Sequence, residues 1–439
     1  MAKTITVLDL GTSKITALIS EIPETGEPRV IGSASLPSKG IRKGVVINIE
    51  EAVNVVAQVL AAAERMADRP IAGVFLSVSG EYIQCTNQKG TISITGSEIT
   101  HEDVQRAVES AKTQLAPYPD NTEFIHIIPN EFTIDSQSGI KYPIGMTGSK
   151  LEVDCHFISI PKSAIQNLSK TVEKLGVEVY GTIFSGWADS YSTLTDTEKE
   201  LGATLLDIGG GTTDIEIFKE GKVVYSASLP VGGVNITADI AAGLHLSSIE
   251  QAEKVKQNLE KIFNTKPEKP INFKEDKKSA KSNKATSAKT TKPADENNAE
   301  NDKVDVSFLN IPDLKTVSKK YLKMIIDARI AEILELAEKG ARQKGVTIKA
   351  PSGIIVTGGS AKLYGITKTI KDIVGVPARI GIPTGLTGML DDIKGPEFAT
   401  VYGLVLATRG LNPSQSTASS KKGSNLMDKI RKMIKSFTQ

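Results

Sequence analysis

The sequence predicts an α/β fold built as an internal duplication, and three observations support this prediction. Two buried strands end in Asp and a glycine turn, "LDLGTSK" in residues 8–14 and "LDIGGGTTD" in residues 206–214. In both halves, two further strands and then a helical segment follow the turn. The chain also has 439 residues, which is enough for two or more packed domains.

The first half reads as three strands, a helix and a fourth strand. Short apolar runs at residues 4–10, 14–22 and 29–36 predict a meander of strands. Apolar residues then recur at helical spacing through residues 48–68, and Pro70 closes the segment. The fourth strand is predicted at residues 72–80.

Residues 84–161 do not continue this pattern of strands and helix, and they are predicted to form a small α+β insert. Thr100 precedes a helical stretch and is followed three residues later by Asp103, which predicts a capped helix start. Alternating apolar positions predict strands at residues 122–135 and 148–160.

The second half repeats the strand, glycine turn, strand pattern over residues 202–233, followed by a helix at 234–246. Residues 274–303 contain no Val, Ile, Leu or aromatic residue, so we expect them to be a disordered, solvated loop. A long helix is predicted at residues 314–345, ended by Gly345, and a strand at 353–359.

Composition excludes several functional classes. The formal net charge of +2 does not favour nucleic acid as a partner. The two cysteines are far apart, and the four histidines show no metal-ligand spacing. Neither a signal-peptide pattern nor a run long enough to span a bilayer is present, so we expect a cytoplasmic protein.

The two glycine turns predict a metal-phosphate site. Glycine lets backbone N–H groups approach phosphate oxygens, and Thr and Ser hydroxyls add donors. Asp9 and Asp207 are expected to face each other, with residues 11–13 and 209–213 on opposite sides of the phosphates. Carboxylates hold Mg²⁺ through its retained waters, and Asp214 is a further carboxylate for the same ion. Neither a P-loop nor a dinucleotide fingerprint is present.

Residues 425–439, "NLMDKIRKMIKSFTQ", predict an amphipathic membrane-binding helix that follows a flexible linker at 411–424. The predicted membrane-binding residues comprise an apolar side and a basic side, namely Leu426, Met427, Ile430, Met433, Ile434, Phe437 and Lys429, Arg431, Lys432, Lys435. Basic residues beside an apolar face suit anionic lipids of an inner leaflet. A single short helix binds weakly, whereas a filament that presents many of them binds firmly.

The paired loops, together with the "TGG" turn at 357–359, resemble the actin/Hsp70/sugar-kinase superfamily of ATP-binding proteins. Residues 130–158 and 184–218 narrow the resemblance to the FtsA family of bacterial cell-division proteins. The likeness covers residue 4 to about 410, apart from 274–303, and includes the terminal tail.

The resemblance implies an actin-like duplicated ATPase fold with two lobes around a nucleotide cleft and a small α+β subdomain, 1C, in place of actin 1B. The implied subdomains are 1A (1–83, 162–194 and 384–410), 1C (84–161), 2A (195–240 and 334–383) and 2B (241–333, with the disordered stretch 274–303).

The resemblance also implies ATP and Mg²⁺ as cofactors. The implied phosphate-binding residues are Gly11, Thr12, Ser13, Gly209, Gly210, Gly211, Thr212 and Thr213, with Asp9, Asp207 and Asp214 around the metal. The implied adenosine-binding residues are Glu253, Lys256, Gly358 and Gly359.

Hydrolysis is expected to be slow or absent, and no catalytic residue is assigned. Several hydrolysing relatives place Glu or Gln where this chain has Ser185 and Gly186, and the nearest acid is Asp189. Serine is a poor general base for an attacking water.

The family implies a filament-forming protein at the inner face of the cytoplasmic membrane, at the division site. It would tether FtsZ by docking the FtsZ C-terminal peptide on 2B, and would contact itself and later division proteins through 1C. Two alternatives stay open: a pilus-assembly protein like PilM, which shares the fold, and a sugar or acid kinase of the same superfamily. The tail argues against PilM, and nothing nominates a catalytic Asp for a kinase.

Overall fold

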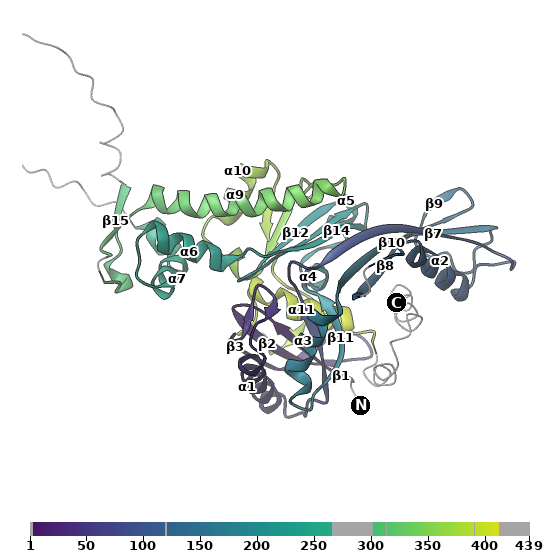
Figure 1. Cartoon of the computed structure of the whole chain (residues 1–439), viewed down its shortest axis with the longest axis horizontal. Coiled ribbons are helices and arrows are strands. Elements are labelled where there is room, and N and C mark those ends of the chain that lie inside the picture. The colour runs from purple at the N-terminus through teal and green to yellow at the C-terminus, as the bar shows by residue number, and fades with distance from the viewer. Residues whose placement is uncertain (1–2, 119–120, 266–301, 313, 390, 412–439) are drawn as a thin grey trace, which may run out of the picture. The chain divides into compact units, whose positions relative to one another are not determined.

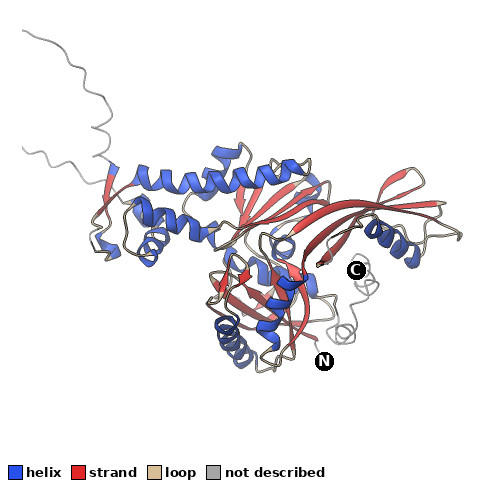
Figure 2. Ribbon diagram, viewed as in Figure 1, coloured by secondary structure: helices blue, strands red, loops and turns tan. Residues whose placement is uncertain are grey.

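A computed structural model describes residues 3–118, 121–265, 302–312, 314–389 and 391–411 of the chain. It divides into two compact units, which are described separately here. The first comprises residues 1–234 and 331–439, and the second comprises residues 235–330. Figures 1 and 2 show the elements of both.

The first large sheet of the first unit has the order β11-β6-β1-β2-β3-β19. Its strands are β1 (Lys3–Leu10), β2 (Lys14–Ile22), β3 (Arg29–Pro37), β6 (Gly73–Val78), β11 (Glu178–Phe184) and β19 (Thr387–Gly388). β1, β2 and β3 form the predicted antiparallel meander, whereas β6 is parallel to β1 and β11 is parallel to β6.

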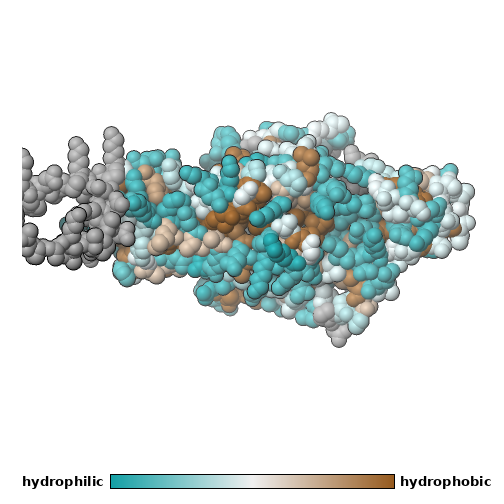
Figure 3. Space-filling model, turned by 90° about the horizontal axis from the view of Figure 1, so that it is seen from above, coloured by the Kyte–Doolittle hydropathy of each residue, from teal (hydrophilic) through white to brown (hydrophobic). Residues whose placement is uncertain are grey.

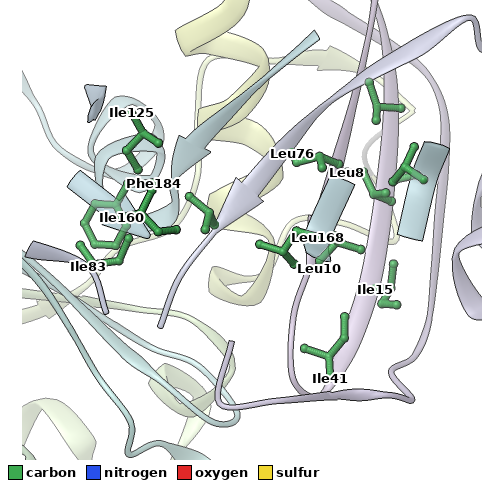
Figure 4. Packing of buried hydrophobic residues seen from close by; sticks show 14 of the residues in the cluster. Leu8, Leu10, Ile15, Ile41, Leu76, Ile83, Ile125, Ile160, Leu168 and Phe184 are labelled. Atoms are coloured by element: carbon green, nitrogen blue, oxygen red, sulfur yellow. The ribbon is translucent and has the colours of Figure 1, made fainter. Parts of the chain in front are cut away.

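Side chains of this sheet enter two hydrophobic clusters. Leu8 and Leu10 of β1 pack in the same cluster as α1 (Ile49–Ala67) and α3 (Lys162–Glu173), whereas Ile5 and Val7 join α11 (Ala399–Thr408). In Figure 4, Leu8 lies beside Leu76, whereas Ile83, Ile125, Ile160 and Phe184 gather in a separate group at the left of the view; all belong to the same cluster. The alternation of a strand's side chains therefore covers both faces of the sheet, as expected when helices flank it.

The second large sheet repeats the first, with the order β14-β13-β12-β17-β18. Its strands are β12 (Ala203–Ile208), β13 (Thr213–Lys219), β14 (Lys222–Leu229), β17 (Ile354–Thr357) and β18 (Ala378–Ile380). β12 pairs antiparallel with β13 and parallel with β17, as β1 pairs with β2 and β6. The predicted internal duplication is confirmed.

Short elements complete this part of the first unit. They are β4 (Ile41–Arg42), β5 (Val45–Val46), α4 (Ser185–Thr193), α5 (Asp196–Leu201), α10 (Ile366–Val374) and the 3-10 helices η4 (Gly359–Lys362) and η5 (Pro396–Phe398). The helix predicted at residues 48–68 is α1, and the side chain of Asn48 caps it by accepting from the N–H groups of Glu50 and Glu51.

The insert forms its own sheet and core within the first unit. Its strands have the order β7-β10-β8-β9, and they are β7 (Gln84–Ser93), β8 (Thr122–Ile134), β9 (Gln137–Ile140) and β10 (Lys150–Pro161). α2 (His101–Thr113) packs on this sheet and begins with the predicted capping box of Thr100 and Asp103. The capped helix start is therefore confirmed.

Buried polar side chains join the insert to the second large sheet. On β10, His156 contacts Asn87 Oδ1 through Nδ1 at 2.6 Å and Ser226 Oγ through Nε2 at 2.9 Å. The Ser226 hydroxyl lies 2.9 Å from each carboxylate oxygen of Glu216 on β13. Because burial lowers the pKa of His156 to about 3, this imidazole is neutral at physiological pH.

The second unit contains most of α6 (Gly233–Gly243), then α7 (Ile249–Gln257), α8 (Leu259–Asn264), β15 (Lys303–Asp305), the 3-10 helix η3 (Ser307–Leu309), β16 (Thr316–Ser318) and the first part of α9 (Lys319–Gln343). Two predicted boundaries are wrong here. The long helix begins at Lys319, since Val317 pairs instead with Val304 in a short antiparallel ladder. Lys303, predicted to be disordered, belongs to the same ladder.

Several predictions fall outside the described residues. These are the remainder of the 274–303 stretch up to residue 301, nearly all of the 411–424 linker and the whole 425–439 helix. None of the helices in the described part of the chain combines the length and apolarity that crossing a bilayer requires. The visible surface is mainly hydrophilic, with hydrophobic residues gathered in separate patches (Figure 3).

Candidate functional site

The first glycine loop connects β1 to β2 and places Asp9 at its base. The Leu10 N–H donates to Ser77 Oγ at 3.1 Å, and the Ser77 hydroxyl donates to Asp9 Oδ1 at 2.6 Å. Burial raises the pKa of Asp9, although the Ser77 hydrogen bond and the charge of Lys14 oppose this rise. The neighbouring strand β6 thus holds the Asp9 carboxylate in a fixed orientation.

The second glycine loop connects β12 to β13 and is held by backbone hydrogen bonds. The Gly209 N–H donates to Thr212 O at 2.9 Å, which closes the turn. The Gly233 and Val234 N–H groups donate to the carbonyls of Gly209 and Gly210 at 2.9 and 2.8 Å. The Thr213 hydroxyl donates to Val231 O at 2.8 Å.

The two loops lie directly against each other. A Cβ atom on Gly210 would lie 1.9 Å from Ser13 Oγ, and one on Gly211 would lie 2.7 Å from Thr12 Oγ1. Real Cβ atoms do not come this close, so glycine is required at both positions while the facing side chains stay in place. The structure therefore brings the predicted residues 11–13 and 209–213 together.

Asp207 and Asp214 lie buried beneath the loops. Burial raises the pKa of Asp207 to about 6; the neighbouring Asp189 carboxyl opposes the rise, the charge of Asp9 adds to it, and Lys14 opposes it. Burial and the charge of Asp207 raise the pKa of Asp214 to about 8. The Ser79 hydroxyl donates to Asp214 Oδ1 at 2.6 Å and lies 3.1 Å from Thr212 Oγ1. These carboxyl groups thus oppose one another's ionisation, and a bound cation would relieve this effect.

Asp189 on α4 is a further carboxylate of this cluster that sequence reasoning did not assign to the site. It is fully buried, and neither of its oxygens makes a hydrogen bond of normal geometry within the described residues, although Asp207 and Thr400 lie beside it. Burial, followed by the charge of Asp207, raises its pKa well above the usual range. Asp207 Oδ1 is likewise buried without a partner among these residues. No local pattern around Asp189 signals this position, because it depends on how α4 packs.

Lys14 is the cation of the cluster, and the sequence analysis gave it no role. Its Nζ lies 3.3 Å from the centroid of the Phe398 ring. Burial lowers the pKa of Lys14 to about 8, while the charges of Glu397 and Asp9 oppose the shift. The signal was present in the sequence, since Lys14 immediately follows the "GTS" of the first loop.

The turn after β17 packs on the second loop. Gly358 has φ +82°, and a Cβ there would lie 2.0 Å from Asp207 Oδ1. By contrast, a Cβ on Gly359 would meet no atom within 4 Å among the surveyed contacts. Gly358 is thus needed for close packing, whereas Gly359 borders open space.

Glu253 and Lys256 lie on α7 in the second unit. The two side chains form an ion pair at 2.7 Å, and both contact Thr237 Oγ1 at 2.7 Å. Burial raises the pKa of Glu253, but the hydrogen bonds from Lys256 and Thr237 outweigh this effect and leave it lowered. They form a preorganised polar group on the face of one helix.

Ser185 and Gly186 begin α4 and are both buried. The Ser185 hydroxyl donates to the carbonyl of Val78 at 3.3 Å. A Cβ on Gly186 would lie 2.9 Å from the Phe184 ring and 3.3 Å from Glu216 Cγ. This position holds no side chain suited to act as a general base.

Direct metal ligation is not evident in the described ranges, where no group of three or more His, Cys, Asp or Glu side chains has a metal-binding arrangement. Mg²⁺ requires no such group, because it usually keeps several waters and is held by one or two carboxylates together with phosphates. The buried, unpartnered Oδ1 of Asp207 fits this mode of binding. The predicted membrane-binding residues between Leu426 and Phe437 lie outside the described residues.

Comparison with protein families places two matches on the chain. A model described as "SHS2 domain inserted in FTSA" matches residues 80–159, and one described as "Cell division protein FtsA" matches residues 204–403.

Full-length relatives agree with these matches. "Cell division protein FtsA" of Pseudomonas aeruginosa is 32% identical over 422 residues, which cover 95% of this chain and 93% of the relative. The protein of the same name from Escherichia coli strain K12 is 32% identical over 410 residues, covering 92% and 90%. That of Borreliella burgdorferi is 33% identical over 401 residues, covering 91% and 89%.

Among solved structures, the "PilM-PilN type IV pilus biogenesis complex" matches with a TM-score of 0.60 and 16% identity, covering 92% of this chain and 98% of that chain. At this identity, the match shows the fold alone. Together with the duplicated sheets and the insert, it confirms the prediction of an actin-like duplicated α/β fold with an α+β insert.

Proposed function

Because the chain belongs to the FtsA family of cell-division proteins, we propose that it binds Mg²⁺-ATP at the two glycine loops and uses this binding to control its assembly on a membrane. The observation that carries the proposal is the contact between the two loops above a cluster of buried carboxylates. Loops of this type supply backbone N–H groups and hydroxyls to phosphate oxygens from two directions.

The carboxylate cluster favours a divalent cation. Asp9, Asp207 and Asp214 lie together, and Lys14 is the cation whose charge acts on Asp9 and Asp207. Bound Mg²⁺ would neutralise phosphate charge and offset the repulsion among these groups. Asp207, with its unpartnered Oδ1, is the best-placed group to hold the waters of the ion, and Asp214 and Asp9 would complete the ring of acceptors.

For the adenosine we propose Glu253 and Lys256 of α7, together with Gly358 and Gly359. The ion pair between Glu253 and Lys256 presets both side chains for hydrogen bonding. The open space beside Gly359 is compatible with close approach of a flat base or a ribose. These assignments predict that substitution of Lys256 weakens binding of adenosine as well as of ATP.

We propose that ATP is bound with slow or absent hydrolysis. The Ser185 hydroxyl is engaged with a backbone carbonyl, and Gly186 has no side chain. Asp189, although nearby, has a raised pKa and lies fully buried behind Asp207, where it is poorly placed to activate a water molecule. Purified protein with Mg²⁺-ATP should therefore release phosphate at a rate close to that of a sample lacking protein.

Nucleotide binding is tested by calorimetry of ATP with Mg²⁺, comparing the wild type with Asp207→Asn and with Asp305→Asn as the control. Asp305 is exposed on β15, and its side chain accepts from the Ser307 N–H. We expect Asp207→Asn to weaken Mg²⁺-dependent binding by at least tenfold, since one charge-assisted contact is worth about 1.5–3 kcal/mol. Equal affinities for all three proteins would contradict the assignment of Asp207.

The cellular role we propose is a filament-forming tether on the inner face of the cytoplasmic membrane at the division septum. In this role, residues 425–439 bind anionic lipids, the second unit docks the C-terminal peptide of FtsZ, and the insert contacts other copies and later division proteins. The second unit offers exposed apolar side chains for a peptide, namely Ile249, Tyr321 and Met324. Lys320 and Lys323, also exposed, lie next to the latter two on α9 and suit an acidic peptide.

The membrane role is tested by sedimentation with anionic vesicles. The intact chain, a chain ending at residue 424 and an Ile430→Glu variant are compared with and without ATP and FtsZ. Both altered chains should lose vesicle binding and keep ATP binding, since a charge on the apolar side opposes insertion. Vesicle binding by the shortened chain would refute the assignment of the tail.

A further inference from the structure

A two-residue hairpin turn between β4 and β5 carries Lys43 in an unusual backbone conformation. Ile41 pairs with Val46 and Arg42 with Val45, so Lys43 and Gly44 form the turn. Their φ angles are +50° and +73°, the combination of a type I′ turn. Asn, Asp and Gly are the residues that favour its first position, and lysine there costs conformational energy. Backbone strain of this kind is concentrated at functional sites in proteins.

The tip of this hairpin rests on both glycine loops. The Gly44 N–H donates to Thr12 Oγ1 of the first loop at 3.3 Å. The Lys43 backbone nitrogen lies 3.0 Å from the position of a Cβ on Gly211 in the second loop. From the other side, the Tyr82 hydroxyl donates to the carbonyl of Gly44 at 2.9 Å. Two hydrogen bonds thus hold the backbone of Gly44, and the backbone of Lys43 lies close to Gly211, at the place where the loops meet.

A second turn in the molecule has the same backbone geometry but different surroundings. Glu220 and Gly221 join β13 to β14 with φ angles of +55° and +76°, which is the same geometry. There, however, a Cβ on Gly221 would meet the carboxylate of Glu200 rather than a glycine loop. Positive φ alone therefore carries no function in this fold. What distinguishes Lys43 is that its backbone lies at the junction of the two loops and that its side chain is cationic.

The Lys43 side chain is exposed, and the described part of the chain provides no ion pair or hydrogen bond to it. Lysine carries a point charge on a flexible four-carbon stem, which suits phosphate and can reach across a loop next to its own backbone. Lys14, the other cation here, is largely buried beside Glu397 and Asp9.

We propose that Lys43 binds the polyphosphate of the nucleotide, so that the β4–β5 hairpin supplies a cationic contact in addition to the two glycine loops. The proposal rests on the nucleotide binding inferred above. Because two hydrogen bonds already hold the turn, only the side chain has to be ordered when phosphate binds. The contact acts on the phosphates and leaves the adenosine untouched.

The test replaces Lys43 by Asn, which the turn prefers, and so removes the charge without disturbing the backbone. Glu220→Asn makes the matching change in the other turn, and Lys43→Arg keeps the charge. Calorimetry with ATP, ADP and adenosine in the presence of Mg²⁺ is combined with thermal unfolding of the proteins.

We expect Lys43→Asn to weaken ATP binding about tenfold and ADP binding less, with adenosine binding and thermal stability maintained. Lys43→Arg and Glu220→Asn should bind ATP like the wild type. Wild-type binding of ATP with unchanged binding by Lys43→Asn would overturn the inference alone, as would an equal loss for ATP and adenosine. Failure of the wild type itself to bind ATP would instead overturn the nucleotide proposal, and this inference with it.

Discussion

Substitution of Glu216 by Gln should make the free energy of unfolding fall less steeply as the pH rises. The reason is that the network joining the insert to the second large sheet requires Glu216 to carry a proton. The Asn87 amide nitrogen donates to Val224 O at 2.9 Å, so its Oδ1 faces the imidazole of His156. The Nδ1 atom of His156 must then carry the proton, and in a neutral ring Nε2 accepts.

The tautomer of His156 then determines which of Ser226 and Glu216 donates in the contact between them. A carboxylate at Glu216 would accept from the Ser226 hydroxyl, which lies 2.9 Å from both of its oxygens and 2.9 Å from Nε2. Because Nε2 needs that same hydroxyl proton, we infer that Ser226 donates to Nε2 and that Ser226 Oγ accepts from a protonated Glu216. Glu216 is therefore protonated in the folded protein. Burial raises the pKa of Glu216 well above its ordinary value; the hydrogen bond with Ser226 opposes this rise, and the charge of Asp214 adds to it. The net direction agrees with a protonated Glu216.

The magnitude follows from linkage between protonation and folding. Between pH 4.5 and the raised pKa, the folded state holds a proton that the unfolded state has released. Rising pH therefore costs the wild type about 1.4 kcal/mol of unfolding free energy per pH unit through this group. Gln supplies an N–H donor to Ser226 and does not titrate. The stability of Glu216→Gln relative to the wild type should rise by the same amount per unit.

Urea unfolding of both proteins at pH 5, 6, 7 and 8 measures the difference. Comparison of the two proteins cancels buried acids whose charge does not act on Glu216, such as Asp9, which titrate in both. A Glu216→Ala variant serves as a control that leaves the Ser226 hydroxyl without its partner, and it should be destabilised at every pH. A constant difference between wild type and Glu216→Gln across this range would refute the proton assignment.

Three further outcomes follow from the structure. Gly403→Ala should destabilise the first unit by about 1–3 kcal/mol in denaturant unfolding, because a Cβ there would lie 1.9 Å from a backbone carbonyl oxygen of α4. Binding of Mg²⁺-ATP should strengthen as pH rises from 6 to 8 and should release protons, measurable by calorimetry in buffers of different ionisation enthalpy, because the pKa values of Asp207 and Asp214 are about 6 and 8. Thr100→Ala should cost about 0.5–2 kcal/mol through loss of the α2 cap, measured by thermal unfolding.

Features governed by local sequence could be predicted well. The duplicated sheets could be predicted from the strand–turn–strand pattern of the two halves. Alternating apolar residues and short continuous apolar runs both indicate strands. The start of α2 followed from two residues three positions apart. The glycine loops were also recognisable, since the Asp and Gly positions are contiguous in sequence.

Features that depend on contacts between distant segments could not be predicted. Residues 316–318 continue smoothly into a helical pattern, but pairing with residues 303–305 makes them a strand, so tertiary contact overrides propensity. Asp189 enters the carboxylate cluster only because α4 packs closely against α11 and the second sheet. The His156 network joins residues from four strands, and no spacing of these residues in the sequence predicts it.

Strand β13 links the two polar regions of the first unit. Asp214 and Glu216 are two residues apart, so their side chains project from the same face of the strand. On the neighbouring strand β14, Ser228 pairs with Asp214 and Ser226 with Glu216 in the same register. One end of this ladder meets Ser79 and the glycine loops, while the other meets His156 of the insert. A shift of β13 against β14 would break both sets of hydrogen bonds together, so the position of the insert and the geometry of the carboxylate site are set by the same pair of strands.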